Sequence, residues 1–264
     1  VGSEMCIRDS QYCDEVKADG FDLVDDFSDL FGMNAAGTDA KMRNTKESIL
    51  EAQFTSGAGN WCTWMFGRDL VNWNNNFTWA KWVTPSRDLI SAFKQEGDEV
   101  RFKESIVYYD CNWSNYYPSD NYPFMYKCRS ANSSIIKFRY ADVLLLKAEA
   151  LIMQDTPDLE GAADIIDEVR DRAKLGALPT SVRSNKNVLL NALLKERRLE
   201  LAFEGQRWFD LVRLDKVEEV MNAVYAKDSG RKAQIYTFDK NSYRLPIPQS
   251  VIDANDKIHQ NPGY

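Results

Sequence analysis

Histidine is almost missing from this sequence of 264 residues, in which His259 is the single example. A zinc-protease motif requires two histidines on one helix and is therefore excluded. A Ser–His–acid triad would have to use His259, and the sequence contains no Gly-x-Ser-x-Gly elbow to carry the serine. A catalytic carboxylate pair stays open, because 40 acidic residues always yield suggestive spacings. We expect no metal site and no cofactor.

Paired cysteines are also missing. No two of the five cysteines form a Cys-x-x-Cys motif, and none has a histidine nearby, so zinc ligation has no support. Cys111 and Cys128 flank an aromatic segment and could form a disulfide in an oxidising compartment, but free buried thiols are the default expectation. The other three are Cys6, Cys13 and Cys62.

The sequence also lacks clusters of positive charge and long apolar runs. There are 33 Lys and Arg against 40 Asp and Glu, a net charge of −7. Because phosphate binding needs clustered basic residues, nucleic acid is not an expected partner. Lys147 and Glu149 interrupt the apolar run 143–153, and no run reaches the roughly 20 residues that cross a bilayer. Any membrane attachment would therefore come from outside this sequence.

Aromatic side chains are abundant and irregularly spaced in two segments. Five of the seven tryptophans fall within residues 61–82, and a second segment spans residues 108–126. Neither segment shows a sustained helix or strand period, and this lack of period predicts loops. Pro118 and Pro123 should also keep the second segment irregular. Aromatic rings among amide side chains can form a sugar-binding site, because sugars stack on the rings and hydrogen-bond to the amides. The candidate ligand-binding residues are Trp61, Trp64, Trp73, Trp79, Trp113, Tyr116 and Tyr117.

A calcium site in the second segment is not expected. Residues 110–114 resemble the start of a calcium loop, but Asn115 stands where the sharp turn needs glycine. Asn121 stands where a bidentate glutamate belongs.

Helical periodicity dominates from about residue 134. Apolar residues from Ala141 to Ile152 form one stripe, and Thr156 with Pro157 is the predicted start of the next helix, which gives one helical hairpin. A third helix is predicted to close at a left-handed Gly205, which turns the chain into a second hairpin. Such hairpins resemble tetratricopeptide-type repeats. The expected fold is mainly α, with long irregular aromatic loops and at most a small amount of β.

Three glutamates on the third helix predict a paired-charge network. Glu196, Glu200 and Glu204 are four residues apart on one face, where like charges repel, so their partners must come from elsewhere. The candidate partners are Arg139, Arg197, Arg207 and Arg213. We interpret this corner as structural, because ion-pair networks perturb carboxylates without doing chemistry.

Four segments, in order along the chain, carry a family resemblance. Residues 196–213, ERRLELAFEGQRWFDLVR, closely resemble the signature of the RagB/SusD family of nutrient-uptake proteins. Residues 137–150 resemble the RYA-type helix of that family and 47–54 the opening of its C-terminal half. The last segment, LPIP at 245–248 followed by QNPGY at 260–264, resembles its C-terminal tail.

The resemblance implies a division of the chain. Residues 1–10 show no signal-peptide pattern and are similar to an adaptor-derived, non-native leader, so we interpret the chain as a fragment. Residues 11–43 would end a helical N-terminal half, and 44–264 would form the C-terminal domain. Within that domain we expect a loop-rich aromatic ligand region (44–134), helical hairpins (135–227) and an irregular tail (228–264).

The resemblance also implies a function without chemistry. The protein would capture an oligosaccharide, or a peptide, at the surface of the outer membrane and pass it to a SusC-like TonB-dependent transporter. It would be held there by an N-terminal lipid anchor absent from this chain. Two alternatives stay open at this stage: a helical-repeat scaffold that binds only protein partners, and a glycoside hydrolase.

Overall fold

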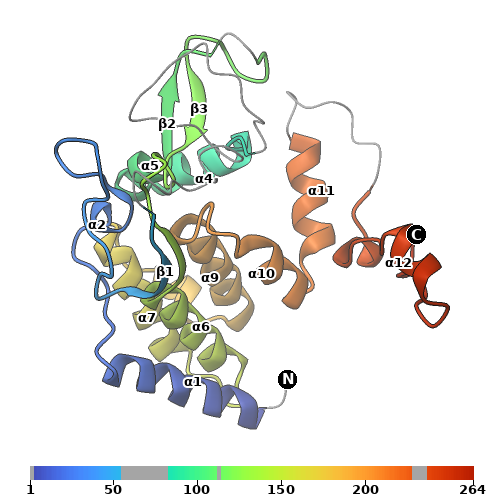
Figure 1. The fold of residues 1–264 in the computed structure, drawn as a ribbon. Helices are drawn as coiled ribbons and strands as arrows, with labels where there is room; N and C mark the ends of the chain where they lie inside the picture. Colours follow the sequence, from blue (N-terminus) through green and yellow to red (C-terminus); the bar gives the residue numbers. More distant parts are fainter. Residues whose placement is uncertain (1–2, 55–82, 112–113, 228–236) are drawn as a thin grey trace. The chain divides into compact units, whose positions relative to one another are not determined.

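The computed structural model describes residues 3–54, 83–111, 114–227 and 237–264. It divides into two compact units, Val1–Gly205 and Gln206–Tyr264, and each is described by itself (Figure 1). The expected domain boundaries at residues 10, 43, 134 and 227 stay predictions.

Three helices form the main core of the first unit. They are α6 (Tyr140–Met153), α7 (Leu159–Arg172) and α9 (Lys186–Glu200), with the short α8 (Thr180–Arg183) before α9. Small and branched side chains on their facing sides, such as Ala148, Ala162 and Ile166, are completely buried and allow close helix packing. The short connection 154–158 makes α6 and α7 a helical hairpin, and the expected mainly α fold with tetratricopeptide-like hairpins is confirmed.

The start of α7 differs from the prediction. Thr156 does not cap the helix; the carboxylate of Asp158 does, accepting a hydrogen bond of 2.9 Å from the amide of Gly161. A Cβ atom on Gly161 would lie 2.4 Å from that carboxylate, so the missing side chain makes room for the cap. Pro157 therefore precedes the helix instead of lying in its first turn.

The first unit also contains two small antiparallel sheets. Strand β1 (Ser48–Ala52) pairs with β4 (Ile135–Arg139), and β2 (Ile106–Tyr109) pairs with β3 (Tyr122–Met125). The second pair corrects the prediction that Pro123 keeps its segment irregular, because Pro123 lies within β3 opposite Tyr108. Both strands of a two-stranded sheet are edge strands. An edge strand tolerates proline, because the position that lacks a backbone N–H can face away from the partner strand.

Two helices precede the β2–β3 hairpin. Helix α4 (Arg87–Glu96) is capped at its start by Ser86, whose hydroxyl accepts a hydrogen bond from the Leu89 amide, and the left-handed Gly97 caps its end. Helix α5 (Glu99–Ser105) follows and leads directly into β2, as Figure 1 shows.

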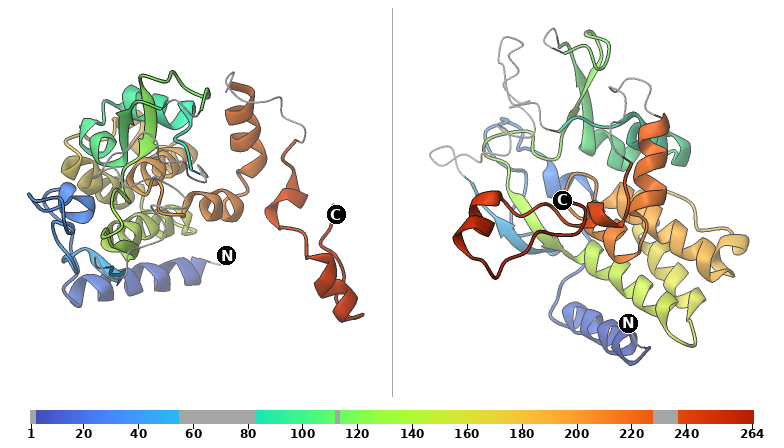
Figure 2. Two further views of the ribbon diagram at one scale, coloured as in Figure 1. Left: turned by 45° about the horizontal axis from the view of Figure 1, so that its top comes forward. Right: turned by 90° about the vertical axis from the view of Figure 1, so that its right-hand side faces the viewer.

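The N-terminal segment of the first unit is helical. Helix α1 (Ser3–Ala18) contacts α6 in the lower part of Figure 1 and of the right-hand view in Figure 2. The short α2 (Ser28–Phe31) contributes Phe31 to a small core with Phe27 and Ile136.

The second unit consists of short helices and turns. They are α10 (Arg207–Arg213), α11 (Val217–Lys227), the 3₁₀ turn η1 (Lys240–Tyr243) and α12 (Gln249–Ala254). The tail, expected to be irregular, thus contains two short helical segments, and α12 begins directly after Pro248. Among the residues described, no helix has both the length and the hydropathy of a membrane span.

Candidate functional site

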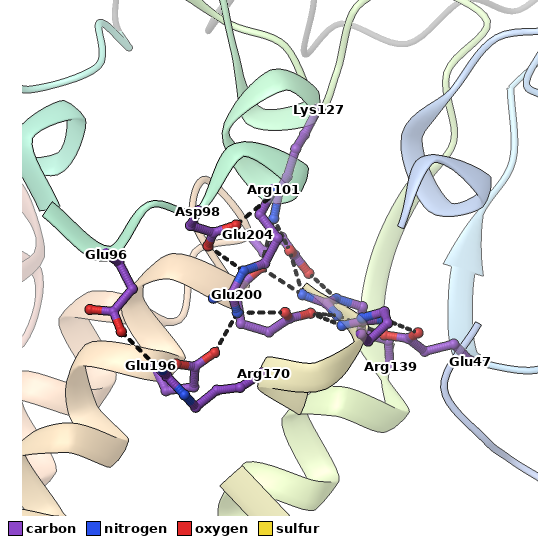
Figure 3. A network of polar contacts seen from close by, with 11 residues as sticks. Glu47, Glu96, Asp98, Arg101, Lys127, Arg139, Arg170, Glu196, Glu200 and Glu204 are labelled. Carbon is purple, nitrogen blue, oxygen red and sulfur yellow. Dashed lines mark hydrogen bonds and ion pairs between the residues drawn. The ribbon is translucent and has the colours of Figure 1, made fainter. Parts of the chain in front are cut away.

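The glutamates of the signature segment lie in a buried network of charges (Figure 3). Arg101 of α5 binds Glu196 at 2.5 Å and Glu200 at 3.0 Å. Arg139, at the end of β4, binds Glu200 at 2.5 Å and Glu204 at 2.7 Å. The other members of the network are Glu47, Glu96, Asp98, Lys127, Arg170 and Arg172.

The network confirms the predicted charge pairing and one of the predicted partners, while Arg207 stays a prediction. Arg139 is a partner of both Glu200 and Glu204. Arg197 instead pairs with Asp142 at 2.8 Å, and Arg213 pairs with Asp210 at 2.9 Å. The cations of the network come from β4, α5, α7 and the segment after β3, so the network ties these elements to α9.

Gly205 has the left-handed conformation that was predicted, with φ of +88°. The helix itself ends earlier, because α9 stops at Glu200 and residues 201–205 form turns in which Phe203 is also left-handed. This turn brings Glu204 back to Arg139 and Lys127.

Burial and neighbouring charge set the protonation of the network. Burial alone would raise the pKa of the Glu200 carboxyl, but the guanidinium groups of Arg172, Arg139 and Arg101 hold it well below its usual range. Burial lowers the pKa of Lys127 to about 8, and the nearby charge of Arg139 opposes its protonation. Because Arg101 and Arg139 are at most 1% exposed, the network is part of the interior and not a ligand surface.

Aromatic side chains of the β2–β3 connection form a different kind of arrangement. The guanidinium carbon of Arg87, the first residue of α4, lies 4.3 Å from the ring centre of Tyr116 and 4.4 Å from that of Tyr117. Arg87 also donates a hydrogen bond from Nη2 to the backbone carbonyl of Tyr116. A cation above an aromatic ring is attracted to the face of that ring. Arg87 therefore holds the loop that carries both tyrosines against the start of α4.

Further contacts fix the orientation of the two rings. The rings of Tyr116 and Tyr117 meet edge to face with centres 4.9 Å apart, and Tyr117 meets the buried Tyr122 in the same way at 5.6 Å. The hydroxyl of Tyr117 donates a hydrogen bond of 2.7 Å to the carbonyl of Pro85. The rings are half-buried, so they are held by the protein and still reach the surface.

These residues line an open hollow of about 840 Å³, which we call the ring-lined hollow. Its walls combine the rings of Tyr116 and Tyr117 with polar side chains from Ser114, Asn115 and Ser119. Fixed aromatic surface beside hydroxyl and amide groups can bind a ligand that is apolar on one face and hydroxylated at its edges.

The first unit also has a more apolar cavity of about 390 Å³ beside the charge network. Phe31, Met125, Ile136 and Phe203 are among its lining residues. Of its three charged lining residues, Lys127 and Glu204 are paired with each other at 2.6 Å and Lys137 is exposed. Its described lining includes none of the predicted ligand-binding residues, so the ring-lined hollow is the better candidate site.

The structure describes only part of the predicted site. Tyr116 and Tyr117 are adjacent and line the same hollow. The five predicted tryptophans lie outside the described residues; they are Trp61, Trp64, Trp73, Trp79 and Trp113. Arg87 was missed, because in the sequence it marks only the start of a helix and lies 29 residues from Tyr116.

Cys111 and Cys128 are buried and form no disulfide, which is the default expectation. Cys111 packs with Tyr122 and Phe124 under the β2–β3 hairpin. Within the described ranges, no group of three or more His, Cys, Asp or Glu side chains is arranged to hold a metal ion.

Comparison with known proteins gives consistent matches. The sequence model described as "SusD family" matches residues 122–264. Two proteins of Formosa agariphila are similar: SusD-like protein P38 is 44% identical over 99 residues, which are 35% of this chain and 19% of that protein. SusD-like protein P2 is 36% identical over 143 residues, which are 52% of this chain and 27% of that protein.

A solved structure extends the likeness in fold. Surface glycan-binding protein A from Bacteroides thetaiotaomicron, in complex with laminarihexaose, aligns with a TM-score of 0.71 at 20% identity. The alignment covers 98% of this chain and 60% of that protein, so the chain spans well under the full length of its relatives. More than half of this chain, including the segment with the buried glutamates, matches the family model. The chain therefore belongs to the SusD family.

Proposed function

We propose that this chain is part of a non-catalytic protein that captures oligosaccharide nutrients. The observation that carries the proposal is the pair of Tyr116 and Tyr117, whose rings are fixed by Arg87 and line an open hollow. Rings that are already ordered lose little conformational freedom when a sugar stacks on them, which favours binding. The laminarihexaose bound by the Bacteroides thetaiotaomicron neighbour makes a glucan the first ligand to test.

The wider role follows from the family. We propose that the captured oligosaccharide passes to a SusC-like TonB-dependent transporter and that the whole protein is a lipid-anchored member of the outer-membrane surface. Stacking surface for the same ligand is also proposed to come from Trp61, Trp64, Trp73, Trp79 and Trp113. A peptide ligand is the alternative that the loop chemistry leaves open.

The described part of the ring-lined hollow favours binding over hydrolysis. A glycoside hydrolase needs two carboxyl groups that flank the scissile bond. Among the described residues that line the hollow none is Asp or Glu, and the glutamates of the signature segment are buried in ion pairs. A scaffold that binds only proteins would show no affinity for sugars at Tyr116 and Tyr117.

The test is isothermal titration of the 264-residue chain with laminarihexaose and with other oligosaccharides of six units. We expect Tyr116→Ala to weaken binding about fivefold, the effect of losing about 1 kcal/mol of ring contact. Tyr12→Ala is the matched control, because Tyr12 is an exposed tyrosine on α1. Equal affinities of both variants, or release of reducing ends during long incubation, would overturn the proposal.

A further inference from the structure

A second hollow adjoins the ring-lined hollow along helix α4. It has a volume of about 430 Å³ and shares Arg87, Tyr117 and Pro118 with its neighbour. Lys94 and Gln95 from α4 and Asn121, the residue before β3, also contribute to its lining. We call it the α4 hollow.

The two cations of the α4 hollow lie on one side of the same helix. Arg87 and Lys94 are seven residues apart, which is close to two helical turns and brings them to the same face. Their backbone positions are separated by roughly 10 Å along the helix axis. A single sugar ring is too small to reach both, whereas an oligosaccharide can lie across them.

The carboxylates of α4 that could neutralise Lys94 are engaged elsewhere. On α4 itself, Asp88 pairs with Arg198 at 2.7 Å and Glu96 pairs with Arg170 at 2.7 Å. The ammonium group of Lys94 is exposed and has no ion-pair partner within the described part of the chain. Asp110 and Asp120, in the neighbouring loop, are exposed and line neither hollow.

The charge of this surface is opposite to that of the whole chain. The sequence carries a net charge of −7, yet the described lining of both hollows contains two cations and no carboxylate. A local excess of positive charge in a hollow attracts anionic ligands and raises their local concentration. Gln95, Asn121 and the ring of Tyr117 supply the hydrogen-bonding and stacking groups that a sugar needs.

We propose that the α4 hollow is a subsite for an anionic sugar, so that the protein prefers oligosaccharides that carry carboxylate or sulfate groups. The inference rests on the proposed glycan-binding function and names the class of ligand. Tyr117 would stack against one sugar unit while Lys94 pairs with the anionic group of a unit further along the chain.

The experiment compares a charged ligand with its neutral counterpart. The probes are hexameric oligogalacturonide, the same oligosaccharide after carboxyl reduction, and a sulfated carrageenan oligosaccharide, each titrated into the full chain. We expect the charged probes to bind at least about threefold more tightly than the reduced one at low salt. The preference should disappear as the ionic strength rises from about 0.05 M to about 0.5 M, because salt screens exposed charges.

Removal of the Lys94 charge tests whether the preference for charged probes arises in the α4 hollow. Lys94→Gln should weaken binding of the charged probe up to about fivefold and leave binding of the reduced probe unchanged. Lys103→Gln is the matched control, because Lys103 is an exposed lysine of α5 that lines neither hollow. Preference for one of the two charged probes identifies the anionic group as carboxylate or sulfate and supports the inference.

Two outcomes would contradict the proposed anionic subsite, each in a different way. If the reduced and charged probes bind equally, or if Lys94→Gln and Lys103→Gln behave alike, the α4 hollow is not an anionic subsite and the glycan-binding function stands. If no probe binds to the folded protein, and laminarihexaose fails as well, the proposed function itself is wrong and this inference falls with it.

Discussion

The hydroxyl of Tyr117 donates a hydrogen bond of 2.7 Å to the carbonyl of Pro85, two residues before α4 begins. This bond joins the β2–β3 connection to the start of the helix whose first residue, Arg87, lies over the same ring. The ring of Tyr117 is therefore placed by contacts to the backbone, to a cation and to Tyr122. The proposed recognition surface is therefore ordered before a ligand arrives.

Tyr117→Phe tests whether this hydrogen bond orders the site. The change removes one part-buried hydrogen bond and should lower the free energy of unfolding by about 1 kcal/mol. Affinity for the oligosaccharide should fall by a smaller factor than in Tyr116→Ala, because the ring is kept. Urea unfolding and titration calorimetry measure the two effects. Tyr12→Phe should change neither quantity, and an identical result for Tyr117→Phe would show that the bond does not hold the ring.

Glu200→Ala tests the buried network. Glu200 is fully buried and its carboxylate accepts hydrogen bonds from Arg101 and Arg139, so its removal leaves buried positive charge without compensation. We expect a loss of about 3–5 kcal/mol in the free energy of unfolding, measured with urea.

The matched control for this variant is Glu219→Ala. Glu219 forms an exposed ion pair with Lys216, and such pairs contribute about 0–1 kcal/mol. If Glu200→Ala does not yield folded protein, Glu200→Gln keeps the size of the side chain and removes only the charge. Losses of similar size at positions 200 and 219 would contradict a structural role for the network.

The pKa of Lys127 predicts a dependence of stability on pH. Burial lowers this pKa from 10.5 to about 8, so between these values the unfolded chain holds a proton that the folded chain has released. Stability conferred by this residue therefore increases as pH rises from about 8 to about 10.5, by up to about 3 kcal/mol. The carboxyl of Glu204 stays ionised throughout this range, because the charge of Arg139 lowers its pKa against the effect of burial.

The measurement compares the wild-type chain with Lys127→Met. Urea unfolding from about pH 7.5 to pH 10.5 gives the difference in free energy at each pH, in which groups common to both proteins largely cancel. The difference should shift in favour of the wild type as pH rises. A difference that is constant, or that shifts the other way, would mean that Lys127 keeps its ordinary pKa in the folded protein.

Asp158→Ala tests the revised start of α7. Loss of the bond to the Gly161 amide should cost about 1 kcal/mol, as is usual for a helix cap. Thr156→Ala, two residues earlier, should change the free energy of unfolding by less than about 0.5 kcal/mol, because Thr156 is exposed and lies outside the helix. Thermal melts followed by circular dichroism separate the two cases. A larger loss of stability for Thr156→Ala than for Asp158→Ala would support the original prediction that Thr156 caps the helix.

The sequence predicted those parts of the fold that depend on local pattern. The apolar stripe of α6 and α7 has helical spacing, so this hairpin was predicted from neighbouring residues alone. The β2–β3 hairpin was missed because Pro123 was interpreted as a break, although an edge strand accepts proline. Its alternation is also hidden, because every residue of β3 is buried.

The candidate site was less predictable, since its contacts join residues far apart in the sequence. The aromatic content of residues 108–126 identified Tyr116 and Tyr117, but no local pattern indicated that Arg87 would lie over their rings. The same holds for the network, where Arg101 and Glu200 are 99 residues apart. Charge repulsion within α9 predicted that partners exist, and Arg139 was among the candidates, but Arg101 and Lys127 are identified only by the three-dimensional structure.

The most direct test of the central claim follows the two rings while a sugar binds. Fluorotyrosine is incorporated throughout the chain, and the ¹⁹F signals are assigned with Tyr116→Phe, Tyr117→Phe and Tyr12→Phe. On addition of an oligosaccharide that binds the chain, the signals of Tyr116 and Tyr117 should shift with the ligand concentration, while that of Tyr12 stays in place. Saturable binding that leaves both signals unchanged would show that the ring-lined hollow is not the site of capture.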